Sequence, residues 1–255
     1  MTIIMRTMLV GMLRESHTVI LTILFPVAML IGLGLYFDNP DYSERLVVGV
    51  LALNVLFGAS MVTAFHVMAH RNRGIYKLLR VTPFSTAAFI CSMTCARAVL
   101  TLLVSCCVLL TGAFVFNVTV SLTSIALLLF ILLVGTICFT AIGFIAANLS
   151  KDESNVNMIS NLICFPMLFT SEAFYSMKNA PDGLQAFAHM QPFYYLVKAM
   201  SAAVSSHGSP LDLWSPATAL AGFAGLCLIL ASVTFRWDPV ESPARGTRRF
   251  IGKLH

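Results

Sequence analysis

Residues 122–149 read LTSIALLLFILLVGTICFTAIGFIAANL and contain no Asp, Glu, Lys or Arg. A helix needs roughly 20 apolar residues to cross the hydrocarbon core of a bilayer, which is about 30 Å thick. This stretch is long enough to cross, and it carries none of the charged side chains that make insertion costly. It therefore predicts a transmembrane helix.

Five other stretches share this apolar character and complete a set of six predicted transmembrane helices: Val19–Phe37, Leu46–Phe65, Ala98–Phe116, Val156–Ser171 and Ala217–Phe235. The stretch Val156–Ser171 is marginal in length. The first stretch contains Pro26 and ends in aromatic residues rather than a small-residue cleavage site, so we expect it to be retained and not removed as a signal peptide. The sequence predicts an all-α polytopic membrane protein with one transmembrane domain over residues 1–255.

The composition agrees with a lipid environment. Of the 255 residues, 58% are hydrophobic and only 11% are charged, whereas soluble domains carry about 25% charged residues. Soluble, disordered, collagen-like and coiled-coil chains are therefore excluded. The net charge of +5 comes from basic residues in short loops separated by apolar runs. These residues form no continuous phosphate-binding stripe, so we expect no nucleic-acid partner.

Lysine and arginine are distributed unevenly between the two sets of loops. With both termini in the cytoplasm, thirteen of the 16 basic residues fall in cytoplasmic segments, Arg97 among them, and the outside keeps Arg45, Lys178 and Lys198. Because positive charge is retained on the cytoplasmic side, this asymmetry predicts an even number of crossings in a cell inner (plasma) membrane. Residues 1–17 predict a helix along the membrane surface, and residues 236–255 a cytoplasmic tail.

The longest predicted cytoplasmic loop, His70–Arg97, is basic and contains no acid. Within it, Gly74–Pro83 is compatible with a short helix that its final proline terminates. An apolar ridge at spacing i, i+3 and i+4 and two basic neighbours mark this helix: Ile75, Leu78, Leu79, Lys77 and Arg80. Such a ridge suits a groove on a partner protein. A solvated loop and an anchor for anionic lipids are the alternatives.

The segment Glu172–Val204 combines prolines with aromatic residues and predicts a broken, re-entrant outer hairpin. We expect it to form an external gate from Glu172, Phe174, Tyr175, Pro192, Phe193 and Tyr194. The carboxylate of Glu172 either lines a water-filled exit or reaches the lipid headgroups.

Four polar residues on the second and fifth predicted helices either line a translocation path or join helices by hydrogen bonds: Asn54, Ser60, Asn157 and Asn161. His66 and His70 have a spacing that suits a metal, and with Glu172 they suggest a membrane-embedded metalloenzyme as another class of function. The predicted topology opposes it, because Glu172 falls on the other side of the bilayer. Cys91 and Cys95 also lack further ligands, so we expect no metal site.

The sequence contains no G-x-x-x-x-G-K-[ST] loop, so any ATP is expected to be hydrolysed by another chain. The loop after the second predicted helix reads Arg71-Asn72-Arg73-Gly74-Ile75-Tyr76-Lys77-Leu78-Leu79-Arg80-Val81-Thr82-Pro83. It resembles the Arg-Glu-Arg/Lys-Gly-Thr-x-x-x-Leu-x-x-Thr-Pro pattern of type 2 ATP-binding-cassette (ABC) exporter permeases, which include daunorubicin-resistance and nodulation-factor export proteins. Asn72 replaces the family acid.

A second block resembles the same family near the C-terminus, through Ala173-Phe174-Tyr175, Pro181, Leu184-Gln185 and Pro192-Phe193-Tyr194-Tyr195. Ser201 stands near the place where the family often has an arginine. Arg14 and Pro26 resemble the family's opening.

The resemblance implies a half-transporter with six helices per chain. Two permease chains, identical or homologous, would work with two cytosolic ATPase subunits that bind the ATP and magnesium, and this chain would bind no cofactor. Gly74–Pro83 would be the coupling helix, with Arg73 and Thr82 in its motif. The expected function is export of an amphiphilic or hydrophobic cargo, such as a drug, a lipid or a lipid-linked sugar. Permeases of the haem-biogenesis or ion-efflux branches are the alternative within the same fold.

Overall fold

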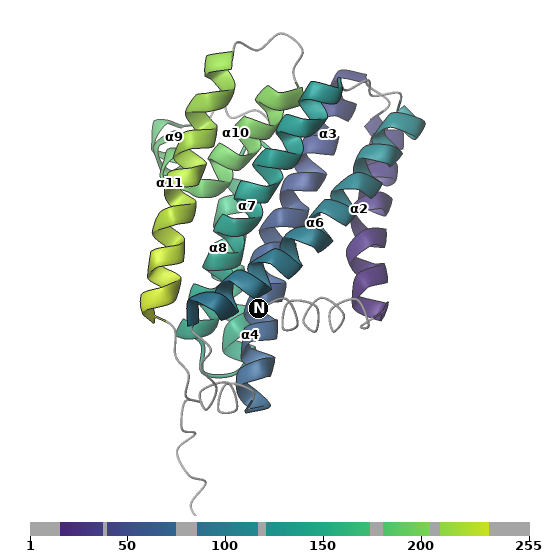
Figure 1. Ribbon diagram of the computed structural model, residues 1–255. Helices are drawn as coiled ribbons and strands as arrows, with labels where there is room; N and C mark the ends of the chain where they lie inside the picture. The colour runs from purple at the N-terminus through teal and green to yellow at the C-terminus, as the bar shows by residue number, and fades with distance from the viewer. Residues whose placement is uncertain are drawn as a thin grey trace, which may run out of the picture.

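The computed structural model describes residues 16–37, 40–74, 86–116, 121–173, 181–204 and 210–234. All regular elements in these ranges are helices, packed side by side (Figure 1). In chain order they are α2 (Ser16–Phe37), α3 (Pro40–Leu53), η1 (Asn54–Met61), α4 (Val62–Asn72), α6 (Thr86–Phe116), α7 (Leu122–Leu149), α8 (Glu153–Phe169), α9 (Asp182–His189), α10 (Pro192–Val204) and α11 (Pro210–Thr234). The predicted surface helix over residues 1–17 lies outside the described residues except for the start of α2, and the predicted tail over 236–255 lies wholly outside them.

Local sequence explains where several helices begin. Helices α3, α10 and α11 start at proline, which has no N–H to leave unpaired in the first turn. Helix α7 follows Ser121, whose hydroxyl accepts the N–H of Ser124 at 3.1 Å. Helix α8 follows Asp152, whose carboxylate accepts the N–H of Asn155 at 2.8 Å. These side chains satisfy donors that have no partner within the helix.

Several helices are longer than the apolar stretches that predicted them, and two of them continue through charged residues. Elements α3, η1 and α4 form one continuous helix, of which η1 is a π-helical segment, whereas the apolar stretch covered only Leu46–Phe65. Helix α6 begins at Thr86, twelve residues before Ala98. The apolar stretch stops at Arg97, but arginine has a high helix propensity and does not end a helix. Arg97, which we expected in a cytoplasmic loop, therefore lies inside a helix.

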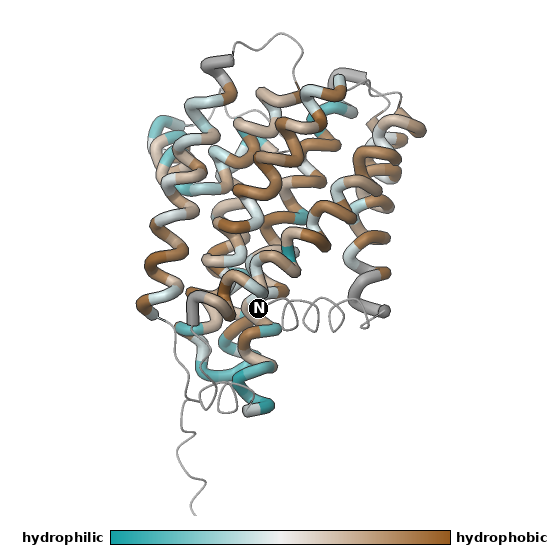
Figure 2. Tube along the Cα trace, in the orientation of Figure 1, coloured by the Kyte–Doolittle hydropathy of each residue, from teal (hydrophilic) through white to brown (hydrophobic). Residues whose placement is uncertain are grey.

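Four helices in the described residues are long and apolar enough to cross a membrane: Tyr42–Asn72, Ala88–Phe116, Leu122–Leu149 and Leu213–Thr234. Thr22–Phe37 is a shorter apolar helix. The chain is thus a multi-pass membrane protein. Helix α8 has 17 residues and falls short of the four in length, and α9 and α10 are shorter still. Figure 2 shows hydrophobic residues along the helices and hydrophilic residues around the projecting end of α4.

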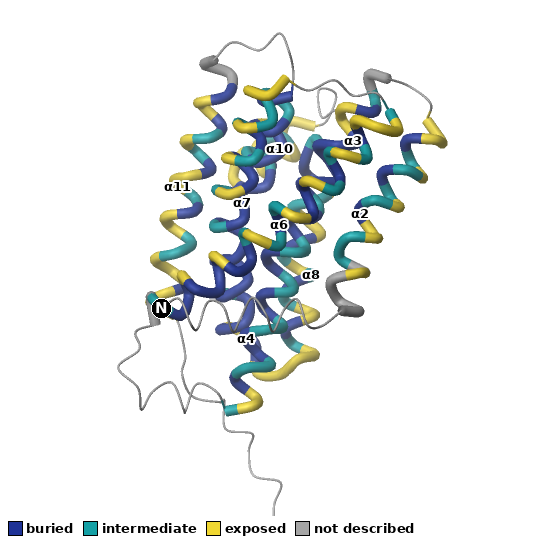
Figure 3. Tube along the Cα trace, turned by 45° about the vertical axis from the view of Figure 1, so that its right-hand side comes forward, coloured by how far each residue is buried: buried dark blue, intermediate teal, exposed yellow. Residues whose placement is uncertain are grey.

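Helix α7 is at the centre of the bundle, because α4, η1, α6, α8, α10 and α11 all pack against it. Figure 3 shows buried residues concentrated on the inner helices, while α2 and α11 expose much of their length. The buried side chains form two apolar clusters. The first, the α10 cluster, includes Phe139 and Phe193. The second, the α4 cluster, includes Phe89 and Phe144.

Candidate functional site

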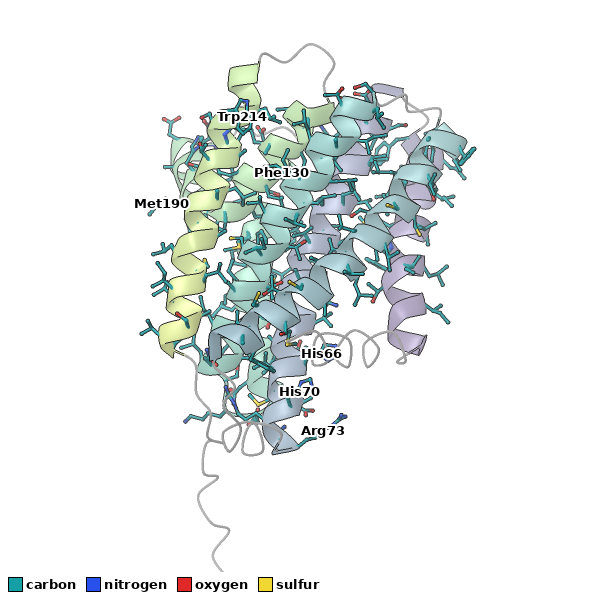
Figure 4. All side chains as sticks on the ribbon, viewed as in Figure 1. His66, His70, Arg73, Phe130, Met190 and Trp214 are labelled. Carbon is teal, nitrogen blue, oxygen red and sulfur yellow. The ribbon has the colours of Figure 1, made fainter. Side chains whose placement is uncertain are left out.

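The end of α4 leads into the predicted coupling segment. Arg73 follows the last residue of the helix and is exposed, and Gly74 has a φ of 70°. This left-handed conformation favours glycine over residues with a side chain. In Figure 4, His66, His70 and Arg73 follow one another along α4 to its projecting end. The remaining predicted coupling residues lie outside the described residues: Ile75, Lys77, Leu78, Leu79, Arg80, Thr82 and Pro83.

Arg71 joins this end of α4 to the end of α7. Its side chain is 2% exposed, and its guanidinium donates to the carbonyl oxygens of Ala147 at 3.1 Å and Ser150 at 3.5 Å. It also donates to the side-chain oxygen of Asn148 at 3.1 Å. The last carbonyl groups of a helix have no partner within the helix and carry partial negative charge. They are therefore suitable acceptors for a buried guanidinium.

Two further hydrogen bonds extend this contact to α8 and α11. The Asn72 amide donates to Oε1 of Glu153 at 3.2 Å, and the Asn148 amide donates to the Thr234 hydroxyl at 3.3 Å. An acid at position 72 would place a second carboxylate beside Glu153, so asparagine suits this contact better than the family acid. We call Arg71, Asn72, Asn148, Ser150 and Glu153 the α4 junction.

Deeper in the bundle, buried polar residues from five helical elements, η1, α4, α6, α7 and α8, lie between the two apolar clusters. We call them the polar layer: Ser60, Thr63, Arg97, Thr140 and Ser160. On α8, for example, Ser160 lies between Val156 of the α4 cluster and Cys164 of the α10 cluster. The helices approach closely here, because a Cβ added at Gly143 would overlap the Ser60 carbonyl oxygen and lie 3.1 Å from the Thr63 Cβ. The apolar interior is thus divided by a polar boundary.

Arg97 is the only charged residue in that layer. It is 5% exposed and lies nine residues into the span that begins at Ala88, a rise of about 13 Å. Its Nη2 donates to the carbonyl oxygen of Gly58 in η1. In the ranges that the structure describes, Nε of Arg97 and Nδ2 of the nearby buried Asn54 have no hydrogen-bond partner. The π-helical turn of η1 that carries Gly58 and Asn54 is a feature common at functional sites.

The structure separates the four predicted path residues into two pairs. Asn54 and Ser60 are buried, and the Ser60 hydroxyl lies 3.3 Å from the sulfur of Cys164. On α8, Asn157 is exposed and Asn161 is half-buried, and the Asn161 amide donates to the Asn157 side-chain oxygen at 3.0 Å. The first pair lies inside the chain, and the second pair is on its surface.

The predicted gate residues that the structure describes lie near the end of α8 and the start of α10: Glu172, Pro192, Phe193 and Tyr194. Phe174 and Tyr175 lie outside the described residues. Glu172 is half-buried. Phe193 is fully buried, with its ring centroid 5.9 Å from that of Phe139, so it supports the core. Tyr194 is half-buried, and its ring contacts His189 with centroids 4.6 Å apart.

The ends of α8 and α10 are joined by Gln191. Its amide donates to the Thr170 carbonyl oxygen at 3.0 Å and to the Thr170 hydroxyl at 2.6 Å. Helix α8 thus connects the two ends of the bundle, since Glu153 at its start belongs to the α4 junction and Glu172 follows its other end.

His66 and His70 lie with their ring centroids 6.4 Å apart. Nδ1 of His70 is 2.6 Å from the His66 carbonyl oxygen, so one of its ring nitrogens is already engaged. Across the described ranges, no group of three His, Cys, Asp or Glu side chains is placed to hold a metal ion. Glu172 follows the far end of α8 and does not complete a site with the histidines. The ligand set of the metalloenzyme alternative is therefore not assembled in the described residues.

The burial of Arg71 and Arg97 is not predicted from the sequence. Arg71 was included only as part of a loop motif, and nothing in its neighbourhood indicates that residues 147–150 accept its hydrogen bonds. Arg97 was placed in a loop because the apolar search ended at charged residues. The uncharged residues 87–96 that precede Arg97 could have indicated this, because they extend the third predicted helix toward the N-terminus, beyond Arg97.

Residues 1–204 match the family model described as ABC-2 type transporter. The matched range contains the α4 junction, the polar layer and the whole predicted coupling segment. No curated protein matches the chain.

Proposed function

This chain belongs to the ABC-2 type transporter family, of which it is a membrane permease domain, and we propose that it forms the membrane-spanning subunit of an ABC exporter. In this proposal it moves an amphiphilic or hydrophobic cargo outward. ATP and magnesium bind to a separate cytosolic ATPase present in two copies, and a second permease chain, identical or homologous, completes the transporter. The small number of charged residues in its helices favours such a cargo over an ion.

The α4 junction is the observation that carries this proposal. A permease driven by a separate ATPase needs a cytoplasmic segment that receives the movement of the ATPase and passes it to the transmembrane helices. Residues 74–83 follow α4 directly, and Arg71 and Asn72 connect the end of α4 to α7 and α8. We therefore assign residues 73–83 to coupling. A displacement of this segment would move α4 and be transmitted to α7 and α8 through the hydrogen bonds of Arg71 and Asn72.

The proposed topology has six crossings with both termini in the cytoplasm. It counts α8 as a crossing although it is short, together with the four long apolar helices and α2. With Arg97 moved into α6, twelve cytoplasmic basic residues remain against three outside. Residues 172–204 then form the outer gate. Cysteines introduced as Lys178→Cys, Lys77→Cys and Arg248→Cys test this in intact cells. A membrane-impermeant reagent should modify only the first, and the reverse pattern would exclude the topology.

The coupling assignment is tested on Leu78, part of the apolar ridge predicted from the sequence. A well-buried leucine contributes about 1.5–3 kcal/mol to such a contact, so Leu78→Ala or Leu79→Ala should weaken ATPase docking at least tenfold. Leu78→Asp should abolish copurification of the ATPase and ATP-dependent export together. Arg45→Gln, which changes an exposed residue of α3, is the control. If the Leu78→Asp chain inserts, retains its ATPase and exports at the original rate, the segment does not couple the ATPase to transport and is only a membrane anchor.

A further inference from the structure

In the described ranges, the hydrogen bond that Arg97 makes goes to a neutral group and not to a carboxylate. No Asp or Glu occurs from residue 45 to residue 151, a range that includes η1, α4, α6 and α7. The hydrogen bond from Arg97 goes to a neutral carbonyl oxygen of Gly58. A charged side chain inside a membrane is costly, and such residues mark substrate or ion pathways by default. Arg71 avoids this problem because several helix-end acceptors surround it, whereas Arg97 has one.

Two buried side chains with unused hydrogen-bond donors lie beside Gly58. Asn54 and Arg97 both adjoin Gly58, since Asn54 Oδ1 lies 3.2 Å from the position of a Cβ at Gly58. Nδ2 of Asn54 and Nε of Arg97 are both buried and lack partners within the described residues. The hydroxyls of Thr63, Thr140 and Ser160 also lack partners there. Buried donors of this kind are normally satisfied, so the site is complete only when an acceptor is present.

The surroundings of the site indicate what kind of acceptor it takes. Apolar clusters lie on both sides of the polar layer, and a small hydrated anion would have to leave water to cross them. On α6, Val99 and Leu103 are exposed, two and six residues after Arg97. An amphiphile dissolved in the bilayer can place its tail along these exposed side chains of α6, while its headgroup binds at the contact between Arg97 and η1.

We propose that Arg97 and Asn54 bind the anionic oxygen headgroup of an amphiphile, a carboxylate or a phosphate, within the membrane. The inference rests on the proposed function, because it defines the cargo of the exporter as an anionic amphiphile. Guanidinium groups bind carboxylate and phosphate oxygens through paired, charge-assisted hydrogen bonds. The Asn54 amide supplies a further donor beside Gly58.

Binding is measured on the full chain purified in a neutral maltoside detergent, with radiolabelled dodecyl phosphate as the probe. We expect saturable binding to the wild type, and competition by dodecanoate but not by dodecyltrimethylammonium. Inorganic phosphate at the same concentration should not compete, and equal competition by it would overturn the assignment to an amphiphile. Arg97→Gln should weaken binding at least tenfold. Arg45→Gln removes an exposed charge of the same type and should leave binding unchanged.

A second variant keeps the test decisive if Arg97→Gln does not fold. Asn54→Asp places a carboxylate beside Gly58, where it can pair with Arg97 and act as an internal competitor. It should abolish binding of dodecyl phosphate and raise the thermal stability of the detergent-purified chain. If Asn54→Asp binds the probe as the wild type does, Arg97 and Asn54 do not form the site. The same conclusion follows if a folded Arg97→Gln retains full binding.

This experiment contains no ATPase and no transport step, so its failure is separate from failure of the proposed function. If the chain supports ATP-dependent export but does not bind the probe, the proposed headgroup site is wrong and the proposed exporter function stands. If the chain binds the probe but has no ATPase partner, the headgroup site stands and the exporter function is wrong.

Discussion

Arg71 in the α4 junction and Arg97 in the polar layer are both almost fully buried, at 2% and 5% exposed, but their guanidinium groups have different surroundings. Arg71 donates to two backbone carbonyl oxygens and one side-chain amide oxygen at the end of α7. Arg97 donates to one carbonyl oxygen, that of Gly58 in η1. In these hydrogen bonds the two guanidinium groups therefore differ in the number of acceptors that they contact.

The comparison shows how burial of the same side chain serves two purposes. At the α4 junction the negative end of the α7 dipole and the unpaired carbonyl groups compensate the charge, so Arg71 stabilises the contact between α4 and α7. In the polar layer the charge is compensated less well, and the folded chain retains it at a cost. Residues that lower stability in this way are expected where binding or movement requires them.

The largest effect expected from this comparison is a loss of stability in Arg71→Leu. The change removes charge-assisted hydrogen bonds worth about 1.5–3 kcal/mol each and leaves helix-end acceptors covered by an apolar side chain. We expect the free energy of unfolding in detergent to fall by about 3–5 kcal/mol, measured by titration with a denaturing detergent. Arg73 lies two residues after Arg71 and is exposed, so Arg73→Leu is the matched control and should change the free energy of unfolding little. A chain of wild-type stability would mean that water replaces Arg71 at these carbonyl groups.

Arg97→Leu should change stability in the opposite direction. An arginine inside a spanning helix costs about 2.5–3.5 kcal/mol, and loss of the charge-assisted hydrogen bond to Gly58 offsets about 1.5–3 kcal/mol of that gain. The same titration should therefore show stabilisation by about 1 kcal/mol, together with loss of cargo export. If Arg97→Leu is destabilised as strongly as Arg71→Leu, the two arginines have the same structural role and the comparison fails.

Much of the fold follows from the sequence, because insertion in a bilayer depends on local apolar length. The run 122–149 forms α7 over the same residues, since Ser121 caps its start and no charged residue interrupts it. The limits of α6 and of the α3–α4 helix were harder to predict. Hydrogen bonding within a helix continues through polar residues such as Arg97 or His70, and hydropathy alone does not show where it ends. Six crossings remain a prediction, because α8 is short.

The site was less predictable, because its contacts join residues that are distant in the sequence. Arg71 contacts residues 147–150, and Arg97 contacts Gly58. No local sequence pattern indicates which distant residue either arginine will contact. The polar residues Asn54 and Ser60 were recognised as unusual within an apolar helix, but their surroundings depend on where α6, α7 and α8 pack. Hydroxyl residues such as Thr140 and Ser160 are common in membrane helices, so their type alone indicates little.

The smallest expected change in stability concerns Asn72, which occupies the position of an acid in the family pattern that the sequence resembles. Its amide donates to Glu153 at 3.2 Å, and both residues are exposed. Asn72→Glu replaces this hydrogen bond by two like charges, and exposed charge pairs are worth about 0.2–1 kcal/mol. We expect a loss of about 0.5 kcal/mol that shrinks at high salt, because added ions screen exposed charges. Glu153→Lys in the same chain should restore stability by pairing with the new carboxylate. A double-mutant cycle isolates this pairwise energy from the effects of each single change. If Asn72→Glu alone is neutral at low salt, the contact with Glu153 does not contribute to the α4 junction, and Arg71 alone holds α4 against α7.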